Sequence, residues 1–385
     1  MEKIPPKIMT KLLPNDKFIP SGGLINILAP KTSPNIKYWL HSHLDGKQVD
    51  DENRAEFYSQ VLNEITNSRY TTTDHLLIRC QISGYNVVFV SLDSSHRSEI
   101  AGHSLSTRLN KICENINVIM REIDNECILF LSEACKPSWI WDTDNQNEWL
   151  RLPAKASNLA QAVRLPANLA QAATVIKTTH CTDWSDMKTI IEKKCNLVHL
   201  LDAPNNDDPY KESYGIAAFA SEKYRDKIKS SERIVLSNEG LRTAACVIRL
   251  EKSEIASLPG DTILIGVHLP LDLLEDKASR AIKPIADLQR PKTNNLGYKT
   301  AYQLCKYMDK YMDEYNTDSI CAIGDFNTIY DSPNREISTW IHDAIDNSKF
   351  QLLVDRSQLT YFGSYFDVHQ NIGQELTSIE SMALI

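Results

Sequence analysis

Residues 321–333 read CAIGDFNTIYDSP, and this stretch decides the fold that we expect. A short apolar run ends in Gly324, an acid and an amide follow at Asp325 and Asn327, and Asp331-Ser332-Pro333 signals a turn. The pattern is typical of a buried strand that presents polar groups where it ends. Because side chains alternate along a strand, Asp325 and Asn327 would face the same way if the strand continued. Gly324 would let a neighbouring backbone approach closely.

Three further apolar segments carry polar groups at their ends. Glu133 follows ILFLS, His268 follows ILIGV, and Asp367 lies in SYFDV. A buried carboxylate costs free energy unless it is paired or binds a metal, so together these residues predict a common site. Each alone has a simpler explanation, a solvated acid or a core histidine. The stretch HSH at 41–43, followed by Asp45, has metal-like spacing, but in a polar loop region a structural role is the simpler interpretation.

Strand-like and helix-like segments alternate from residue 76 onward. LLIRCQI and NVVFVSL predict two adjacent strands, with a hairpin turn at residues 83–85, and 106–123 predicts an amphipathic helix. Several strand pairs are joined too briefly for parallel crossovers, which favours an α+β sandwich with mixed sheets over a doubly wound sheet. We expect an N-terminal extension at 1–75 and a domain at 76–385. Within the domain, an insertion at 140–205 contains the near-duplicates RLPAKASNLAQAV and RLPANLAQAATV.

The order of these segments resembles a known family. IGDFNTIYDSP resembles the GDFN motif of the endonuclease/exonuclease/phosphatase superfamily, the DNase I-like phosphoesterases. LFLSEA and IGVHLPL resemble that family's glutamate and histidine strands. YGIAAFASEKY, NEGLRTAACVI and LTYFGSYFD resemble three further strands, so that the likeness extends over about residues 76–370. The resemblance implies a four-layer α/β sandwich with two mixed β-sheets.

The resemblance also implies a function, a hydrolase that cleaves phosphodiesters or phosphomonoesters with Mg²⁺, or with Mn²⁺ as the alternative. Glu133 would hold the metal, Asp325 would orient the attacking water, and His268 and Asn327 would contact the phosphate. Asp367 would pair with a histidine on the family's last strand. The substrate would be a phosphate ester, either a nucleic acid, as for a nuclease, or a phosphoinositide or a nucleotide.

Two departures from the family pattern leave a second interpretation open. Asp93 stands where the family has an asparagine, and we expect it to be a metal ligand; Asn86 is the alternative register. The family ends in a strand with Ser-Asp-His, whose histidine acts as a general base or stabilises the transition state, and no such motif follows Asp367. His369 is a poor substitute, because it would lie on the same strand as Asp367. The last strand is therefore expected to be missing, and the alternative function is a catalytically impaired homologue that acts as a binding or effector protein.

Composition narrows the class of protein and of partner. The 385 residues are 42% hydrophobic and carry a formal net charge of −8, which argues against a protein that coats nucleic acid. Nine scattered cysteines fit free thiols in a reducing compartment. No signal-peptide core and no membrane span are apparent. We expect a cytoplasmic protein, with a secreted effector as the alternative.

Overall fold

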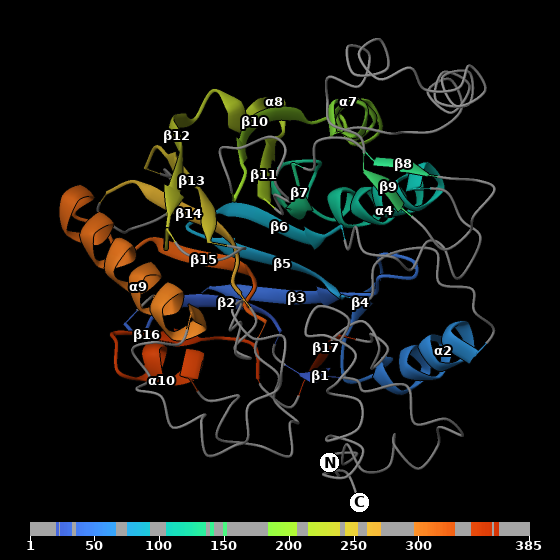
Figure 1. Ribbon diagram of the computed structural model, residues 1–385, viewed down its shortest axis with the longest axis horizontal. Coiled ribbons are helices and arrows are strands. Elements are labelled where there is room, and N and C mark those ends of the chain that lie inside the picture. The colour runs from blue at the N-terminus through green and yellow to red at the C-terminus, as the bar shows by residue number, and fades with distance from the viewer. Residues whose placement is uncertain are drawn as a thin grey trace, which may run out of the picture.

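The fold is built from two β-sheets that lie face to face between helices (Figure 1). The computed structural model describes residues 21–22, 24–32, 36–66, 75–92, 105–135, 139–141, 149–151, 184–205, 215–238, 243–252, 260–270, 296–327, 340–355 and 358–361. This architecture confirms the expected α+β class with two mixed sheets.

The six-stranded sheet contains the strand that ends in Asp325. Its order is β12 (Ile228–Val235), β13 (Ala244–Leu250), β14 (Thr262–His268), β15 (Ile320–Asp325), β2 (Ile25–Pro30) and β16 (Phe350–Leu352). β14 and β15 run parallel, whereas the other neighbouring pairs are antiparallel. The strands that end in His268 and Asp325 therefore end side by side.

The seven-stranded sheet contains the strand of Glu133. Its order is β10 (Val198–Ala203), β11 (Gly215–Ala220), β7 (Ile128–Ala134), β6 (Tyr85–Ser91), β5 (Leu77–Ile82), β3 (Lys37–His41) and β4 (Gln48–Val49). β6 and β7 are parallel, and β5 and β6 form the expected hairpin. Its two turn residues, Ser83 and Gly84, both have positive φ, as tight β-hairpin turns require.

Three apolar clusters hold the layers together. One lies between the sheets, and there Gly266 of β14 leaves room for the ring of Phe130 from β7, since a Cβ on Gly266 would lie 2.4 Å from that ring. The second packs α9 (Leu296–Tyr315) and α10 (Trp340–Asp346) on the six-stranded sheet. The third packs α4 (Leu105–Arg121) and α7 (Trp184–Cys195) on the seven-stranded sheet. The layers are thus helix, sheet, sheet and helix.

The smaller elements surround this sandwich. α2 (Arg54–Thr66) contributes Phe57 and Val61 to the cluster between the sheets, and α8 (Glu222–Arg225) is a single turn. β1 (Ser21–Gly22) pairs with β17 (Leu359–Tyr361), and β8 (Trp139–Trp141) pairs with β9 (Trp149–Arg151). No described helix is both long enough and apolar enough to cross a bilayer.

The N-terminal part of the chain is a component of the sandwich, which corrects the expected extension at 1–75. β2 is an interior strand of one sheet, and β3 and β4 close one side of the other. The sequence 25–30, INILAP, is short and borders proline-rich segments, so its local pattern did not indicate a buried strand. Likewise α7 and β10 lie inside the expected insertion 140–205 but pack as part of the seven-stranded sheet's layers. The duplicated repeats from residue 152 onward lie outside the described residues.

The strand expected to be missing leaves no gap at either candidate site strand. β6 is flanked by β5 and β7, and β15 is flanked by β14 and β2. β2 and β5 come from the part of the chain before residue 83. β6 and β15 therefore both have hydrogen-bonded neighbours on either side, and one neighbour of each comes from the N-terminal part.

Candidate functional site

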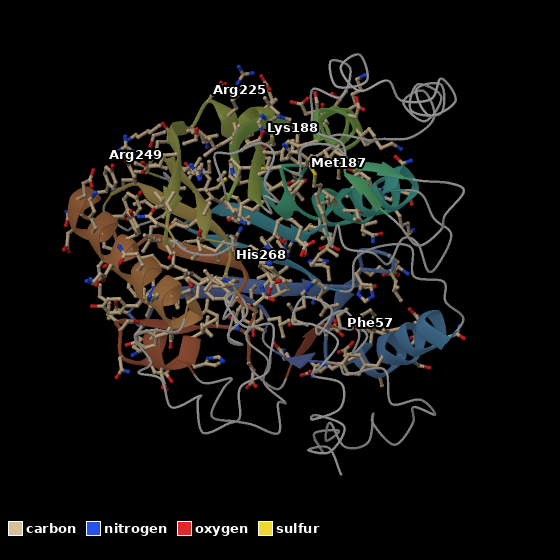
Figure 2. All side chains as sticks on the ribbon, in the orientation of Figure 1. Phe57, Met187, Lys188, Arg225, Arg249 and His268 are labelled. Carbon is tan, nitrogen blue, oxygen red and sulfur yellow. The ribbon has the colours of Figure 1, made fainter. Side chains whose placement is uncertain are left out.

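His268 and Asp325 form the centre of the site. The parallel register of β14 and β15 pairs these two residues, and both are 2% exposed. His268 Nε2 lies 3.6 Å from Asp325 Oδ2, which is the distance of an ion pair. Figure 2 shows His268 in the middle of the molecule, away from its rim. The sequence prediction that these strand ends meet is confirmed.

A second imidazole reaches the same carboxylate. His75, just before β5, is buried, and its Nε2 lies 3.8 Å from Asp325 Oδ2. β5 runs antiparallel to β6, so the beginning of β5 lies beside the end of β6. This contact therefore shows that the carboxyl ends of β6 and β15, from different sheets, lie at the same edge of the sandwich.

Thr360 joins the two sheets at this edge. Its backbone carbonyl accepts a hydrogen bond from Leu76 N at 2.9 Å, and its hydroxyl oxygen accepts one from Ile25 N at 3.3 Å. Leu76 leads into β5 of the seven-stranded sheet, whereas Ile25 begins β2 of the six-stranded sheet. The position of His75 relative to Asp325 is thus fixed by hydrogen bonds from both sheets to Thr360, one to its carbonyl and one to its hydroxyl.

Asn327 lies next to Asp325 but in a different geometry from the one expected. Its φ is 51°, so the chain leaves the strand conformation after Asp325, and simple alternation no longer applies. Asp325 Oδ1 accepts a hydrogen bond from Asn327 N at 2.8 Å, and Asn327 Nδ2 donates to Leu269 O at 2.7 Å. The amide thus stabilises the turn after the strand. Gly324 has the expected role, because a Cβ there would lie 1.9 Å from Val267 O.

Glu133 lies at a bulge in β7. Gly215 pairs with Ala134 but Ala217 pairs with Leu131, so β7 has one more residue than β11 between these pairs. Glu133 itself has φ of 56°, and Ala134 packs in the outer cluster, where strict alternation from Leu131 would not put it. Bulges re-aim side chains in this way. Ser132 and Glu133 therefore lie opposite the single residue Ile216, and the regular alternation of side chains is interrupted at Glu133.

The remaining predicted residues do not add to this cluster. Asp93, Asp367 and His369 lie outside the described residues. His41 and His43 are buried, and His41 Nδ1 lies 3.0 Å from Gly46 O, which is a structural contact. Within the described part of the chain, no group of three His, Cys, Asp or Glu side chains is arranged to hold a metal ion.

His75 is the site residue that the sequence analysis missed. The signal was present, because TTDHLLIRC places an acid and a histidine directly before an apolar strand. The family pattern places the corresponding histidine after Asp367. Nothing in the local sequence around His75 indicates that β5 pairs with β6 near the edge where β15 ends.

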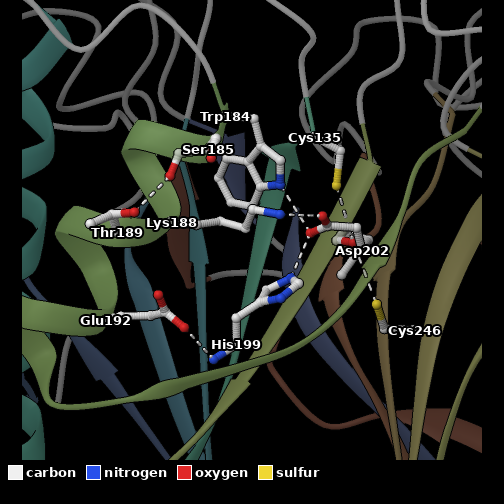
Figure 3. A network of polar contacts seen from close by, with 10 residues as sticks. Cys135, Trp184, Ser185, Lys188, Thr189, Glu192, His199, Asp202 and Cys246 are labelled. Atoms are coloured by element: carbon white, nitrogen blue, oxygen red, sulfur yellow. Dashed lines mark hydrogen bonds and ion pairs between the residues drawn. The ribbon is translucent and has the colours of Figure 1, made fainter.

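A second polar network lies on the outer face of the seven-stranded sheet (Figure 3). Asp202 of β10 accepts hydrogen bonds from Trp184 Nε1 and Lys188 Nζ, both at 2.9 Å, and lies 2.8 Å from His199 Nε2. Burial alone would raise the pKa of Asp202, but the hydrogen bonds from His199, Lys188 and Trp184 outweigh it and lower the pKa to about 2. The network fastens α7 to the edge strand β10.

Neither the family models, nor the curated proteins, nor the solved structures compared with this chain contain a match.

The cluster at the sheet edge is suited to proton transfer. One carboxylate is shared by two imidazoles at distances slightly beyond a hydrogen bond, in surroundings from which water is largely excluded. A carboxylate beside an imidazole orients the ring. The arrangement would accept a proton at one imidazole while the other donates a hydrogen bond to an anion.

Proposed function

We propose that the chain is a metal-dependent phosphoesterase with a DNase I-like fold, in which His75 supplies the acid–base imidazole. The observation that carries the proposal is the buried group of His75, Asp325 and His268, at the edge where the GDFN strand ends. A histidine held against a carboxylate is the usual device for taking a proton from an attacking water.

The order of the strands supports a circularly permuted form of that fold. In the resemblance described above, the strand with Ser-Asp-His comes last; here Thr73-Asp74-His75 precedes β5, which pairs with β6. The antiparallel pairing of Ser21 with Tyr361 brings the two ends of the described chain together. When the two ends of a chain lie close together, they can be joined and the chain opened at another turn. The strands then keep the same arrangement in space, although their order along the sequence changes.

The donor groups at this edge suit a hard cation. Mg²⁺ is commonly held by one or two carboxylates and retains several waters, so a cluster of three protein ligands is not required. Glu133, which lies at the bulge near the end of β7 and is only partly buried, would hold the ion. When bound, Mg²⁺ would polarise a phosphate oxygen and stabilise the departing oxygen.

The protein's own side chains would supply proton transfer, hydrogen bonding to the phosphate and orientation of these groups. Asp325 would orient His75, which would take the proton from the attacking water. His268 would donate a hydrogen bond to a phosphate oxygen, and Asn327 would hold the turn that fixes Asp325. The substrate class is a phosphate ester. The net charge of −8 weighs against long nucleic acid and toward a nucleotide or phosphoinositide.

The competing interpretation, an impaired homologue with a binding or effector role, was motivated mainly by the absence of the last histidine strand. His75 lies against Asp325 and offers an imidazole at that position. For this reason we favour the enzyme over the binding protein.

The decisive experiment compares two histidine variants. His75→Gln should lower kcat on a phosphodiester or phosphomonoester substrate with Mg²⁺ by about 10²–10⁴-fold, the usual contribution of an acid–base group. His199→Gln is the matched control, because His199 also pairs with an aspartate but lies on the outer face of the sheet. Equal rates for wild type and His75→Gln, or no turnover by folded wild type with Mg²⁺ or Mn²⁺ on nucleic acid, phosphoinositide and nucleotide substrates, would refute the proposal.

A further inference from the structure

Two serines lie side by side at the ends of the strands next to the candidate site. Ser91 ends β6 and pairs in register with Ser132 of β7. Their side chains follow Phe89 and Phe130 by two positions, and both phenylalanines belong to the cluster between the sheets. By the alternation of a strand, the two hydroxyls point into the same space between the sheets.

This pair lies at the edge where His75 meets Asp325. Ile78 pairs with Phe89 in the β5–β6 hairpin, and the same register continued by two residues sets Leu76 level with Ser91. His75 precedes Leu76 directly. The backbone hydrogen bond from Leu92 N to Ser132 O, 3.1 Å long, keeps the ends of β6 and β7 together.

Both hydroxyls are buried and have no hydrogen-bond partner among the described residues. Ser91 is 1% exposed and Ser132 is 0% exposed, and neither oxygen makes a hydrogen bond within the described part of the chain. Buried polar groups in proteins nearly always have a partner, and those that have none call for an explanation such as a bound water, ion or substrate. Two such groups in one register, next to a cluster suited to catalysis, indicate a ligand that accepts hydrogen bonds.

Building on the function proposed above, we propose that Ser91 and Ser132 form a subsite for the oxygens of the substrate's phosphate group. A hydroxyl donates a hydrogen bond without adding charge, and a phosphate oxygen is a strong acceptor. The site already contains the acids Asp325 and Glu133, so neutral donors can face the anion without forming ion pairs with these acids. A metal ion would instead be drawn to the carboxylates.

If the two serines form this subsite, removal of their hydroxyls should weaken phosphate binding but should not lower stability. Ser91→Ala and Ser132→Ala each remove a hydroxyl that has no partner, so the midpoint of thermal unfolding should stay the same or rise. Each variant should bind inorganic phosphate about 10- to 100-fold more weakly in the presence of Mg²⁺, as expected for the loss of a hydrogen bond to a charged group. Ser→Cys variants at the two positions keep the side-chain shape but have a weaker donor. Their phosphate affinity should lie between those of the wild type and the alanine variants.

Ser319 is the matched control. It is buried just before β15, at the strand's opposite end from Asp325, and its hydroxyl pairs with those of Ser83 and Thr262 at 2.5 and 2.9 Å. Ser319→Ala should therefore lower the unfolding midpoint and leave phosphate affinity unchanged.

Phosphate affinity is measured by calorimetry on the full chain, so the result does not depend on turnover. Binding that weakens in Ser91→Ala and Ser132→Ala supports the subsite even if the wild type hydrolyses nothing, in which case only the proposed function fails. Unchanged phosphate affinity in both variants, or no phosphate binding by the wild type, overturns the subsite even if the protein is an active esterase. Unchanged affinity with a raised unfolding midpoint would identify the hydroxyls as unsatisfied groups or water sites only.

Discussion

Glu133 and Asn327, two residues of the candidate site, have a left-handed backbone that is uncommon outside glycine. Asparagine adopts it more readily than most residues, and at Asn327 the backbone N donates to Asp325 Oδ1 while the side-chain amide donates to Leu269 O. Glu133 lies at a bulge of β7, whose neighbouring strands β6 and β11 maintain its conformation. Strained backbone maintained by neighbouring structure is concentrated at functional sites, in agreement with the proposed role of Glu133.

The lowered pKa of His41 predicts that the protein becomes less stable in acid. Burial is the largest cause that lowers its pKa from 6.5 to about 4; the hydrogen bond with Gly46 O acts against the shift, and nearby Arg79 adds to it. The unfolded chain then binds more protons than the folded protein below pH 6.5, so stability is full above that pH and falls between about pH 6.5 and 4. This group alone accounts for about 3 kcal/mol of the loss.

The variant His41→Asn should lack the pH-dependent part of the unfolding free energy that His41 causes. Chemical denaturation of both proteins at pH 7.5, 6, 5 and 4 would measure it, and the free-energy difference between them should narrow as the pH falls. Parallel curves for the two proteins over this range would mean that His41 is not held neutral by burial.

The elements predicted from sequence are those with long and regular patterns. The amphipathic helix at 106–123 and the strands before Glu133, His268 and Asp325 were indicated by periodicity alone, and they correspond to α4, β7, β14 and β15. β12, with the sequence IKSSERIV, was missed because a partly exposed edge strand is mostly polar. His75 was missed for a different reason: long-range pairing brings it to the site, and local patterns contain no information about that pairing.

The hydrogen bonds of Asp202 predict that this residue stabilises the packing of α7 against its sheet. Asp202→Asn keeps an acceptor for Trp184 but removes the charge that Lys188 and His199 contact, so unfolding should become easier by about 1–3 kcal/mol. Amide hydrogen exchange should accelerate in α7 and β10 and stay unchanged in α9. Asp309→Asn is the control, because Asp309 pairs with Lys349 in a half-exposed ion pair that contributes little. Equal effects of the two substitutions would show that the Asp202 network does not fasten α7.

At the scale of the whole molecule, the N-terminal part of the chain builds both sheets. β2 lies beside β15, whereas β3, β4 and β5 extend the other sheet from β6. The site therefore combines a histidine that precedes β5 with an aspartate from β15, although these segments are far apart in the sequence. Helices cover the two outer faces of the sandwich (Figure 1), and His75 contacts Asp325 at an edge where strands of both sheets end.

The circular permutation that we propose can be tested by moving the ends of the chain to another turn. A variant opened at the turn between Ser83 and Gly84, with residues 385 and 1 joined by a flexible linker, would start with β6 and end with β5. Few contacts cross a two-residue turn, and Ser21 already pairs with Tyr361, so the variant should fold with an unchanged circular dichroism spectrum and wild-type phosphate affinity. Refolding should be slower, because the β5–β6 pair changes from a local hairpin to the most distant pairing in the chain.

A variant opened between Val88 and Phe89, both buried inside β6, is the control and should not fold. If the variant opened at the turn also failed to fold, β5 and β6 would depend on their covalent connection, and the present order of strands along the chain would be required for this fold.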